Sequence, residues 1–273
     1  MKSLRTFATA AVASACMFVA ACSGGGNAGA PSSSPATAGT TGGSELSGKV
    51  VVFAAASLNK AFTELGDELK KDNPGLDITF SFEGSSTLVD QMSEGAPADV
   101  FASADEKNMT RASESKLVGE PKEFATNVLT LIVPAGNPAK VTGLDASLDN
   151  ARLVVCAKGV PCGNATEKLA ADLGVTLKPV SEEQKVTDVR GKVEAGEADA
   201  GLVYTTDAKA AGDKVEIIPV EGADKVVNHY PIALTTAGES NPAAKAFMDL
   251  VLSAHGQEVL ASYGFGAGAD ATK

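Results

Sequence analysis

The sequence contains no tryptophan, only two histidines and only four cysteines among its 273 residues. Without tryptophan it offers no obvious aromatic platform on which a sugar or a nucleobase could stack. Basic residues are also scarce, because 23 lysines and arginines face 34 aspartates and glutamates, for a formal net charge of -11. Nucleic-acid binding needs clustered Lys and Arg, so this composition argues against a nucleic-acid partner.

The motifs of several enzyme classes are absent as well. No P-loop and no dinucleotide-binding fingerprint occurs, and the segment "EGSST" at residues 83–87 does not match the nucleophile elbow of serine hydrolases. His229 and His255 are each more simply explained as structural or surface residues than as catalytic ones. Carboxylates are numerous, but no spacing singles out an acid–base pair. The residues alone therefore favour none of these enzyme classes.

Long apolar runs are missing except at the N-terminus, where Lys2 and Arg5 precede an apolar run over residues 7–21. This run is shorter than the roughly 20 apolar residues that a transmembrane helix needs. A short basic segment followed by such a run is typical of a secretory signal peptide, which we predict over residues 1–21.

The segment "VAAC" at residues 19–22 resembles the bacterial lipobox, whose cysteine becomes the lipidated first residue of the mature protein. This resemblance predicts lipidation of Cys22 and a protein anchored to the outer face of the cell membrane. A plain signal peptide cleaved near the same place is the alternative. Residues 22–47 are rich in Gly, Ser, Thr, Ala and Pro, with Glu45 as the only charged residue, so we expect a flexible tether.

The cysteines divide into two groups. Cys16 lies in the predicted signal peptide and Cys22 at its end, which leaves Cys156 and Cys162 in the part expected to fold. In an exported protein two such thiols predict a disulfide, which would close the small loop "CAKGVPC". A two-cysteine metal clip is the alternative, and it is disfavoured because no third or fourth ligand lies nearby in the sequence.

The rest of the chain alternates between strand and helix patterns. The apolar run at residues 49–57 is typical of a strand buried on both faces, and residues 58–71 carry apolar side chains at helical spacing. A strand pattern at residues 76–82, a short helix and another strand ending at residue 104 follow, and the alternation repeats after residue 127. Two such α/β segments in about 225 residues predict two lobes with mainly parallel sheets. Ligands in such folds bind beyond the carboxyl ends of the strands.

Four loops place hydroxyl groups or small residues where a helix is expected to begin. They contain Ser57, Ser85, the segment 161–163, and Asp188 as the cap of a helix whose first turn holds Val189. Unpaired backbone N–H groups and the helix dipole make such helix starts sites for anions without any cation. The alternative is that each serine is an ordinary helix cap, which is the simpler explanation of either one alone.

Six segments carry a family resemblance that spacing alone does not give. In order between residues 49 and 265, they resemble segments of the molybdate-binding proteins of bacterial ABC transporters: "VFAAASL", "FEGSSTLVDQMSEGAPADVFASAD", "VPCGNA", "DVRGKVEAGEADAGLVYTTDA", "YPIAL" and "GQEVLASYGF". The resemblance implies a two-lobed α/β fold of the type II periplasmic-binding-protein class, with mixed sheets flanked by helices and the ligand in the cleft between the lobes. We expect one lobe to comprise residues 48–126 and 231–273, and the other to comprise residues 127–230.

The resemblance also implies a function and a set of ligands. Such a protein binds molybdate or tungstate outside the cytoplasmic membrane and delivers it to an ABC permease. We therefore expect a monomer that is not an enzyme and that uses no cofactor. Carried over by position, the oxyanion is bound by the hydroxyl and backbone N–H groups of Ser57 and Ser85, by the backbone N–H groups of Cys162 and Val189, and by the hydroxyl of Tyr204. These groups would contact the oxygens of the anion, and none would be a direct metal ligand. The position of Cys162 commonly holds a small residue such as alanine, and we expect the disulfide there to stiffen the loop.

A socket of neutral donors suits a fully deprotonated dianion, because each hydrogen bond is then assisted by charge. Phosphate carries a proton near neutral pH, and its buried O–H would lack an acceptor, so we expect phosphate to bind poorly. Sulfate has the same charge as molybdate but shorter bonds, and sulfate or another tetrahedral oxyanion is the nearest alternative cargo. A secreted enzyme acting on phosphate or sulfate esters and a surface lipoprotein that binds another protein are more distant alternatives.

Overall fold

The computed structural model describes residues 45–272. The predicted signal peptide, Cys22 and the tether up to residue 44 lie outside the described residues, so the predictions for them stay predictions. The segment Gly43–Lys273 forms one compact unit, which holds two β-sheets. None of the helices within residues 45–272 is long and apolar enough to cross a membrane.

The first sheet has six strands in the order β11-β4-β10-β3-β1-β2. β1 pairs in parallel with β2 and β3, while β10 runs antiparallel to β3 and β4. The side chains of β1 are buried almost continuously from Val50 to Ala55, as expected for a strand that is covered on both faces. The strands are β1 (Ser47–Ala55), β2 (Gly75–Glu83), β3 (Val100–Ala102), β4 (Lys122–Asn127), β10 (Asn228–Leu234) and β11 (Gly266–Ala267).

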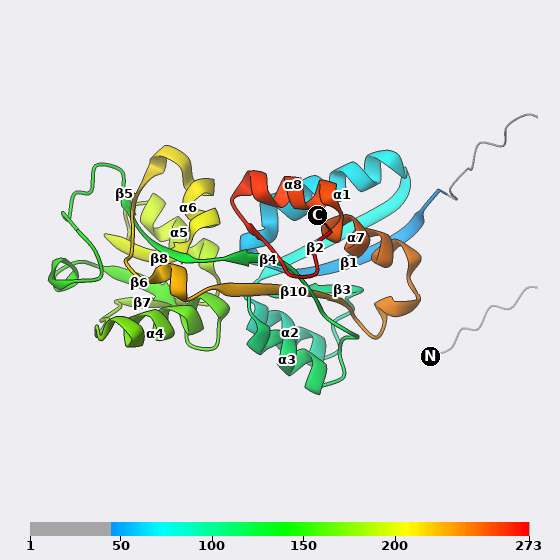
Figure 1. The fold of residues 1–273 in the computed structure, drawn as a ribbon, viewed down its shortest axis with the longest axis horizontal. Helices are drawn as coiled ribbons and strands as arrows, with labels where there is room; N and C mark the ends of the chain where they lie inside the picture. The colour runs from blue at the N-terminus through cyan, green and yellow to red at the C-terminus, as the bar shows by residue number, and fades with distance from the viewer. Residues whose placement is uncertain (1–44, 273) are drawn as a thin grey trace, which may run out of the picture. The chain divides into compact units, whose positions relative to one another are not determined.

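Helices cover both faces of the first sheet, with α1, α7 and α8 on one face and α2 and α3 on the other (Figure 1). On the first of these faces the buried rings of Phe62 and Phe247 pack edge-on, with centroids 5.4 Å apart, which joins α1 to α7 through a large apolar contact. The helices are α1 (Asn59–Asp72), α2 (Ser85–Ser93), α3 (Glu106–Glu114), α7 (Pro242–Leu252) and α8 (Ala254–Tyr263).

The second sheet has five strands in the order β7-β6-β8-β5-β9, with β6 parallel to β7 and β8 and with β5 antiparallel to β8 and β9. α4 begins with Pro161 and is followed by Gly174 at φ 66°, residues that suit a helix start and a left-handed helix end. The elements of this part are β5 (Leu129–Pro134), β6 (Leu153–Cys156), α4 (Pro161–Leu173), β7 (Ser181–Glu183), α5 (Val186–Glu194), β8 (Ala200–Tyr204), α6 (Thr205–Ala211) and β9 (Val215–Ile218). Short 3-10 helices complete the chain: η1 (Ala56–Leu58), η2 (Ala146–Leu148), η3 (Gly212–Lys214), η4 (Ala223–Lys225) and η5 (Gly238–Ser240).

Two segments connect the sheets. β4 leads through Val128 directly into β5, and β10 brings the chain back from the second sheet into the first (Figure 1). Where these segments run side by side, Asn127 of β4 lies opposite Asn228 of β10. The structure therefore confirms the two-lobed α/β fold with mixed sheets flanked by helices. The expectation of mainly parallel sheets is wrong, because β10 and β5 each pair antiparallel with both of their neighbours.

Candidate functional site

A small cavity lies where the loops after β1, β2 and β3 meet the starts of α4 and α5 and the end of β8. Its volume of about 10 Å³ is room for about one water molecule. Four of the five predicted anion ligands line it, namely Ser57, Ser85, Cys162 and Tyr204. Segments that are far apart in the sequence thus converge at the carboxyl ends of parallel strands, where α/β folds bind their ligands.

Neither serine caps a helix. Gly84, not Ser85, is the N-cap residue of α2, and Ser57 lies within η1, whose N-cap residue is Ala55. The Ser85 side chain is fully buried, and its Oγ accepts a hydrogen bond from the backbone N–H of Ala104 at 3.0 Å. The interpretation of these serines as ordinary helix caps is therefore wrong. Both residues instead line the cavity.

Cys162 is the second residue of α4, and it is 2% exposed. A backbone N–H at this position has no acceptor within its own helix, so it is free to bind an anion. The predicted disulfide is confirmed, because Cys162 is bonded to Cys156 at the end of β6 with an S–S distance of 2.05 Å. The disulfide links the first turn of α4 to the C-terminal end of β6. A Cβ on the neighbouring Gly163 would come within 2.0 Å of the Ala157 carbonyl oxygen, so the backbone at this turn is closely packed.

Val189 lies deeper in its helix than the sequence indicated. The N-cap residue of α5 is Lys185, and Asp188 falls in the first turn, so the prediction that Asp188 caps this helix is wrong. Val186, the first residue of α5, lines the cavity, whereas Val189 is fully buried one turn further along. Nothing in the sequence pattern distinguished Val186 from its neighbours. The predicted contact of the Val189 N–H group with the anion stays a prediction.

Tyr204 ends β8 and is 1% exposed. Its hydroxyl accepts a hydrogen bond from Nδ2 of Asn228 at 3.0 Å. Burial raises the pKa of the Tyr204 phenol well above its ordinary value, and the nearby Tyr230 and Asp105 raise it further. The hydroxyl therefore keeps its proton at any physiological pH, so it is available as a hydrogen-bond donor.

The cavity is electrically neutral apart from one carboxylate. Among the residues described, no Lys, Arg or His lines it. Glu83 is the single charged residue in its wall, and it forms an ion pair with Lys185 of the second lobe at 3.0 Å. The cavity can therefore attract an anion through O–H and N–H groups and helix starts rather than through a buried cation.

Comparison with known proteins identifies the family of this chain. Residues 50–266 match the family of bacterial extracellular solute-binding proteins. The chain belongs to this family. It is 44% identical to the molybdate-binding protein ModA of Mycobacterium tuberculosis over 86% of this chain and 89% of that protein. It is 36% identical to the molybdate-binding protein ModA of Escherichia coli over 80% of this chain and 89% of the relative. The relatives are named as molybdate-binding proteins and the family as solute-binding proteins, which agrees with the prediction of a binding protein rather than an enzyme.

Solved structures of solute-binding proteins share the fold. The periplasmic molybdate-binding protein of Azotobacter vinelandii superposes with a TM-score of 0.68 at 19% identity, covering 79% of this chain and 98% of that one. The sulfate-binding protein SubI of Mycobacterium tuberculosis superposes with a TM-score of 0.64 at 20% identity, covering 80% and 86%. Because proteins with different cargoes share this fold, the fold does not identify the anion.

Polar contacts outside the cavity join the two lobes of this solute-binding protein. Nδ2 of Asn164 donates to the Asp105 carboxylate at 3.0 Å, and Nδ2 of Asn108 donates to the Gly159 carbonyl at 3.2 Å. Gly84 also approaches the second lobe closely, since a Cβ built on it would lie 2.1 Å from the Gln184 carbonyl oxygen. The lobes are therefore in contact on several sides of the cavity, as expected for a closed conformation.

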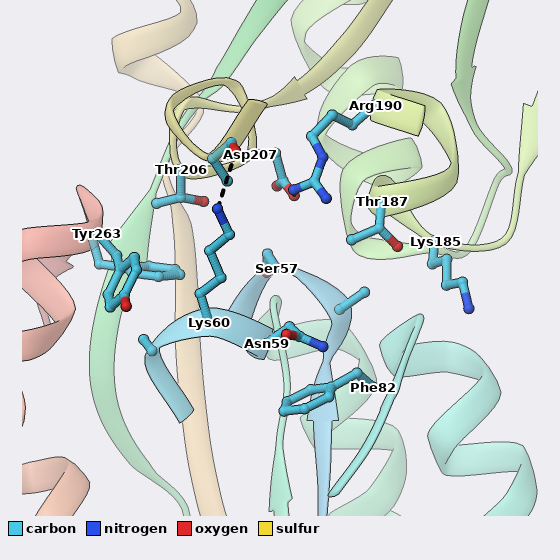
Figure 2. A pocket seen from close by; sticks show the side chains of 14 residues that line it. Ser57, Asn59, Lys60, Phe82, Lys185, Thr187, Arg190, Thr206, Asp207 and Tyr263 are labelled. Carbon is cyan, nitrogen blue, oxygen red and sulfur yellow. Dashed lines mark hydrogen bonds and ion pairs between the residues drawn. The ribbon is translucent and has the colours of Figure 1, made fainter. Parts of the chain in front are cut away.

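A larger cleft of about 310 Å³ adjoins the cavity, and Ser57 lines both (Figure 2). Lys60 of α1 reaches across this cleft and donates to the Ala210 carbonyl of α6 at 3.1 Å. The Arg190 guanidinium lies beside Asp207, with Nη1 3.6 Å from the carboxylate. Burial raises the pKa of the Asp207 carboxyl to about 7, although Arg190 opposes this rise. The sequence did not single out these residues, although Arg190 and Asp207 both lie in the segment 188–208 that carries the family resemblance.

Proposed function

We propose that this solute-binding protein binds molybdate or tungstate in the small cavity and delivers it to an ABC permease. The observation that supports this proposal most strongly is the convergence of Ser57, Ser85, Cys162 and Tyr204 on one cavity that no cation lines. Two hydroxyls at loop ends, a free helix N–H and a tyrosine hydroxyl form a set of donors, which matches an anion without protons. The names of the relatives at 44% and 36% identity support the same cargo.

The donors would come from both lobes, so binding and lobe closure are coupled. Ser57 and Ser85 lie in the lobe that we assign to residues 48–126 and 231–273, and Tyr204 lies in the lobe assigned to residues 127–230. Cys162, and Val189 through its backbone N–H, would bind from the same side as Tyr204. An anion that is bonded to both lobes stabilises the closed state by its higher affinity for that state.

The cavity in its present shape is smaller than a tetrahedral oxyanion, because its volume is about 10 Å³. Binding therefore requires the walls to move apart slightly while the donors stay in reach. The permease would recognise the closed surface and release the anion by separating the lobes. We further propose that the mature protein is exported and held at the outer face of the membrane by a lipid on Cys22.

Calorimetric titration of the mature protein with molybdate, tungstate, sulfate and phosphate tests the proposal. We expect molybdate and tungstate to bind more tightly than about 1 μM, and sulfate and phosphate to bind far more weakly. Tight binding of sulfate alone would reassign the cargo to that anion. Absence of binding by all four anions would contradict the proposal and would reopen the ester-hydrolysing alternative.

A further inference from the structure

A hydroxyl group can donate or accept a hydrogen bond, and an anion can only accept. A cavity that binds a dianion through serine and tyrosine hydroxyls must therefore turn their protons inward. The protein groups behind each hydroxyl decide this direction, because a hydroxyl oxygen that accepts from a buried donor must direct its own proton elsewhere.

Asn228 sets the direction at Tyr204. Its Nδ2 donates to the Ala104 carbonyl at 2.9 Å and to the Tyr204 hydroxyl at 3.0 Å, and its side chain is buried. A carbonyl oxygen can only accept, so the amide nitrogen of Asn228 must face Ala104, which fixes the orientation of the amide. The second amide hydrogen then points at Tyr204. The tyrosine oxygen accepts it, so the phenolic proton is free for another acceptor, which is either the nearby Tyr230 hydroxyl or an anion in the cavity that Tyr204 lines.

The same residue, Ala104, sets the direction at Ser85. Its backbone N–H points at Ser85 Oγ with an N–O distance of 3.0 Å. A backbone N–H can only donate, so Ser85 accepts this bond and keeps its own proton for another partner. The N–H of Ala104 thus orients the Ser85 hydroxyl. The Ala104 carbonyl holds Asn228, which orients the Tyr204 hydroxyl.

Asn127 sets the direction at Ser57 through one intermediate. Oδ1 of Asn127 accepts from the Val128 N–H at 3.0 Å, which places Nδ2 toward Thr206 Oγ1 at 2.8 Å and the Tyr230 hydroxyl at 3.4 Å. Tyr230 accepts from Asn127, and its hydroxyl lies 3.1 Å from Ser57 Oγ, a pair in which either oxygen can donate. We assign Tyr230 as the donor, in which case Ser57 accepts from behind and its own proton is free to point into the cavity.

The two asparagines lie opposite each other on β4 and β10, the strands that connect the lobes. We propose that Asn127 and Asn228 are positioning residues that direct the hydroxyl protons of Ser57 and Tyr204 into the anion cavity, so that both hydroxyls act as donors to the anion. This inference rests on the proposed function, since it concerns how that site excludes anions that carry a proton. It assigns a part in selectivity to residues that do not line the cavity.

Two matched double-mutant cycles on the full-length mature protein test the proposal. Asn228→Asp replaces the amide donor by an acceptor of the same size, so the Tyr204 hydroxyl donates to the new carboxylate and turns away from the anion. Tyr204→Phe should then weaken molybdate binding about 10- to 100-fold in the wild-type background but less than about twofold in the N228D background. Asn127→Asp should have the same effect on Ser57→Ala, because Tyr230 would then donate to residue 127 and accept from Ser57.

The crossed pairs control for the added charge and for any loss of stability. N228D with S57A and N127D with Y204F carry the same charge change, yet their effects on molybdate affinity should be additive.

A second readout is the selectivity of the protein between molybdate and hydrogen arsenate. Both aspartate variants should lose affinity for molybdate more than for hydrogen arsenate, since a hydroxyl lone pair then faces the anion and can accept its proton. Should N228D fail to fold, Asn228→Leu replaces it in the cycle, and the penalty of Y204F should again shrink at least about fivefold.

The outcomes separate this inference from the proposed function. Wild-type binding of molybdate with additive effects in the matched pairs would overturn the role of the asparagines and leave the proposed function standing. Equal coupling in matched and crossed pairs would also overturn it, because the effect would then come from charge or general destabilisation. A wild-type protein that binds neither molybdate nor tungstate would overturn both.

Discussion

Ser85→Ala probes the candidate site most directly, because one substitution has two separate consequences. The variant removes an O–H donor from the cavity wall, which should weaken molybdate binding by about 1.5–3 kcal/mol, or roughly 10- to 100-fold. It also leaves the N–H of Ala104, a residue only 2% exposed, without its acceptor at 3.0 Å. An unsatisfied buried N–H costs about 1–3 kcal/mol, so the free energy of unfolding should fall by that amount.

The assay is calorimetric titration with molybdate at pH 8, together with denaturant unfolding of the ligand-free protein. Ser86→Ala is the matched control, since Ser86 neighbours Ser85 on α2 but does not line the cavity. We expect S86A to change affinity and stability by less than about 0.5 kcal/mol. Wild-type affinity in S85A, with only the stability lowered, would refute the assignment of Ser85 as a ligand and return it to a structural role.

Substitutions at the disulfide, at Gly84 and at Asp207 test other parts of the cavity and of the larger cleft beside it. Replacing Cys156 and Cys162 together by alanine should lower the free energy of unfolding by about 2 kcal/mol, from the entropy of the small closed loop, and should weaken molybdate binding; unchanged affinity after confirmed loss of the bond would show that the disulfide does not stiffen the site. Gly84→Ala should hinder closure and weaken binding, because its Cβ would lie 2.1 Å from the Gln184 carbonyl oxygen; titration at wild-type affinity would contradict this. The Asp207 carboxyl has a pKa of about 7 when folded and 3.8 ordinarily. The folded state therefore holds this proton more tightly, so stability should fall as pH rises from about 4 to 7. Asp207→Asn should flatten that part of the pH profile measured by denaturant unfolding.

Much of the fold could be predicted from hydrophobic pattern. The apolar run at residues 49–57 corresponds to β1, and the helical spacing over residues 58–71 corresponds to α1, each shifted by one or two residues. α3 (Glu106–Glu114) was not predicted, because its sequence "EKNMTRASE" is mostly polar and only a narrow face is buried. β4 (Lys122–Asn127) was not predicted either. It forms a strand because it pairs with β10 far along the chain, and no local sequence pattern encodes such a pairing.

In the candidate site, the residues in recognisable sequence segments could be predicted, whereas those whose role depends on distant partners could not. Ser57, Ser85, Cys162 and Tyr204 were predicted because each lies in a segment with a family resemblance, and the structure brings them to one cavity. Their supporting residues Asn127 and Asn228 gave no signal. A single asparagine in a strand has no characteristic spacing, and its role follows only from the partner that faces it across two strands. The serines were also mistaken for possible caps, because a cap and a cavity ligand both favour a hydroxyl where a helix starts.

An acidic protein that must release a dianion gains from a cavity without cations. A buried Lys or Arg would lose its counter-charge each time the anion left, and an uncompensated buried charge is far more costly than a free hydroxyl or N–H group. Neutral donors can bond to water as soon as the lobes separate, so the open state is not penalised. With a net charge of -11 over the whole chain, attraction for the anion must come from groups at the cavity wall. In the proposed site this attraction is lost when Tyr204 and Cys162 move away from Ser57 and Ser85. Separation of the lobes is therefore sufficient for release, and the protein needs no further change in charge or protonation to deliver its cargo.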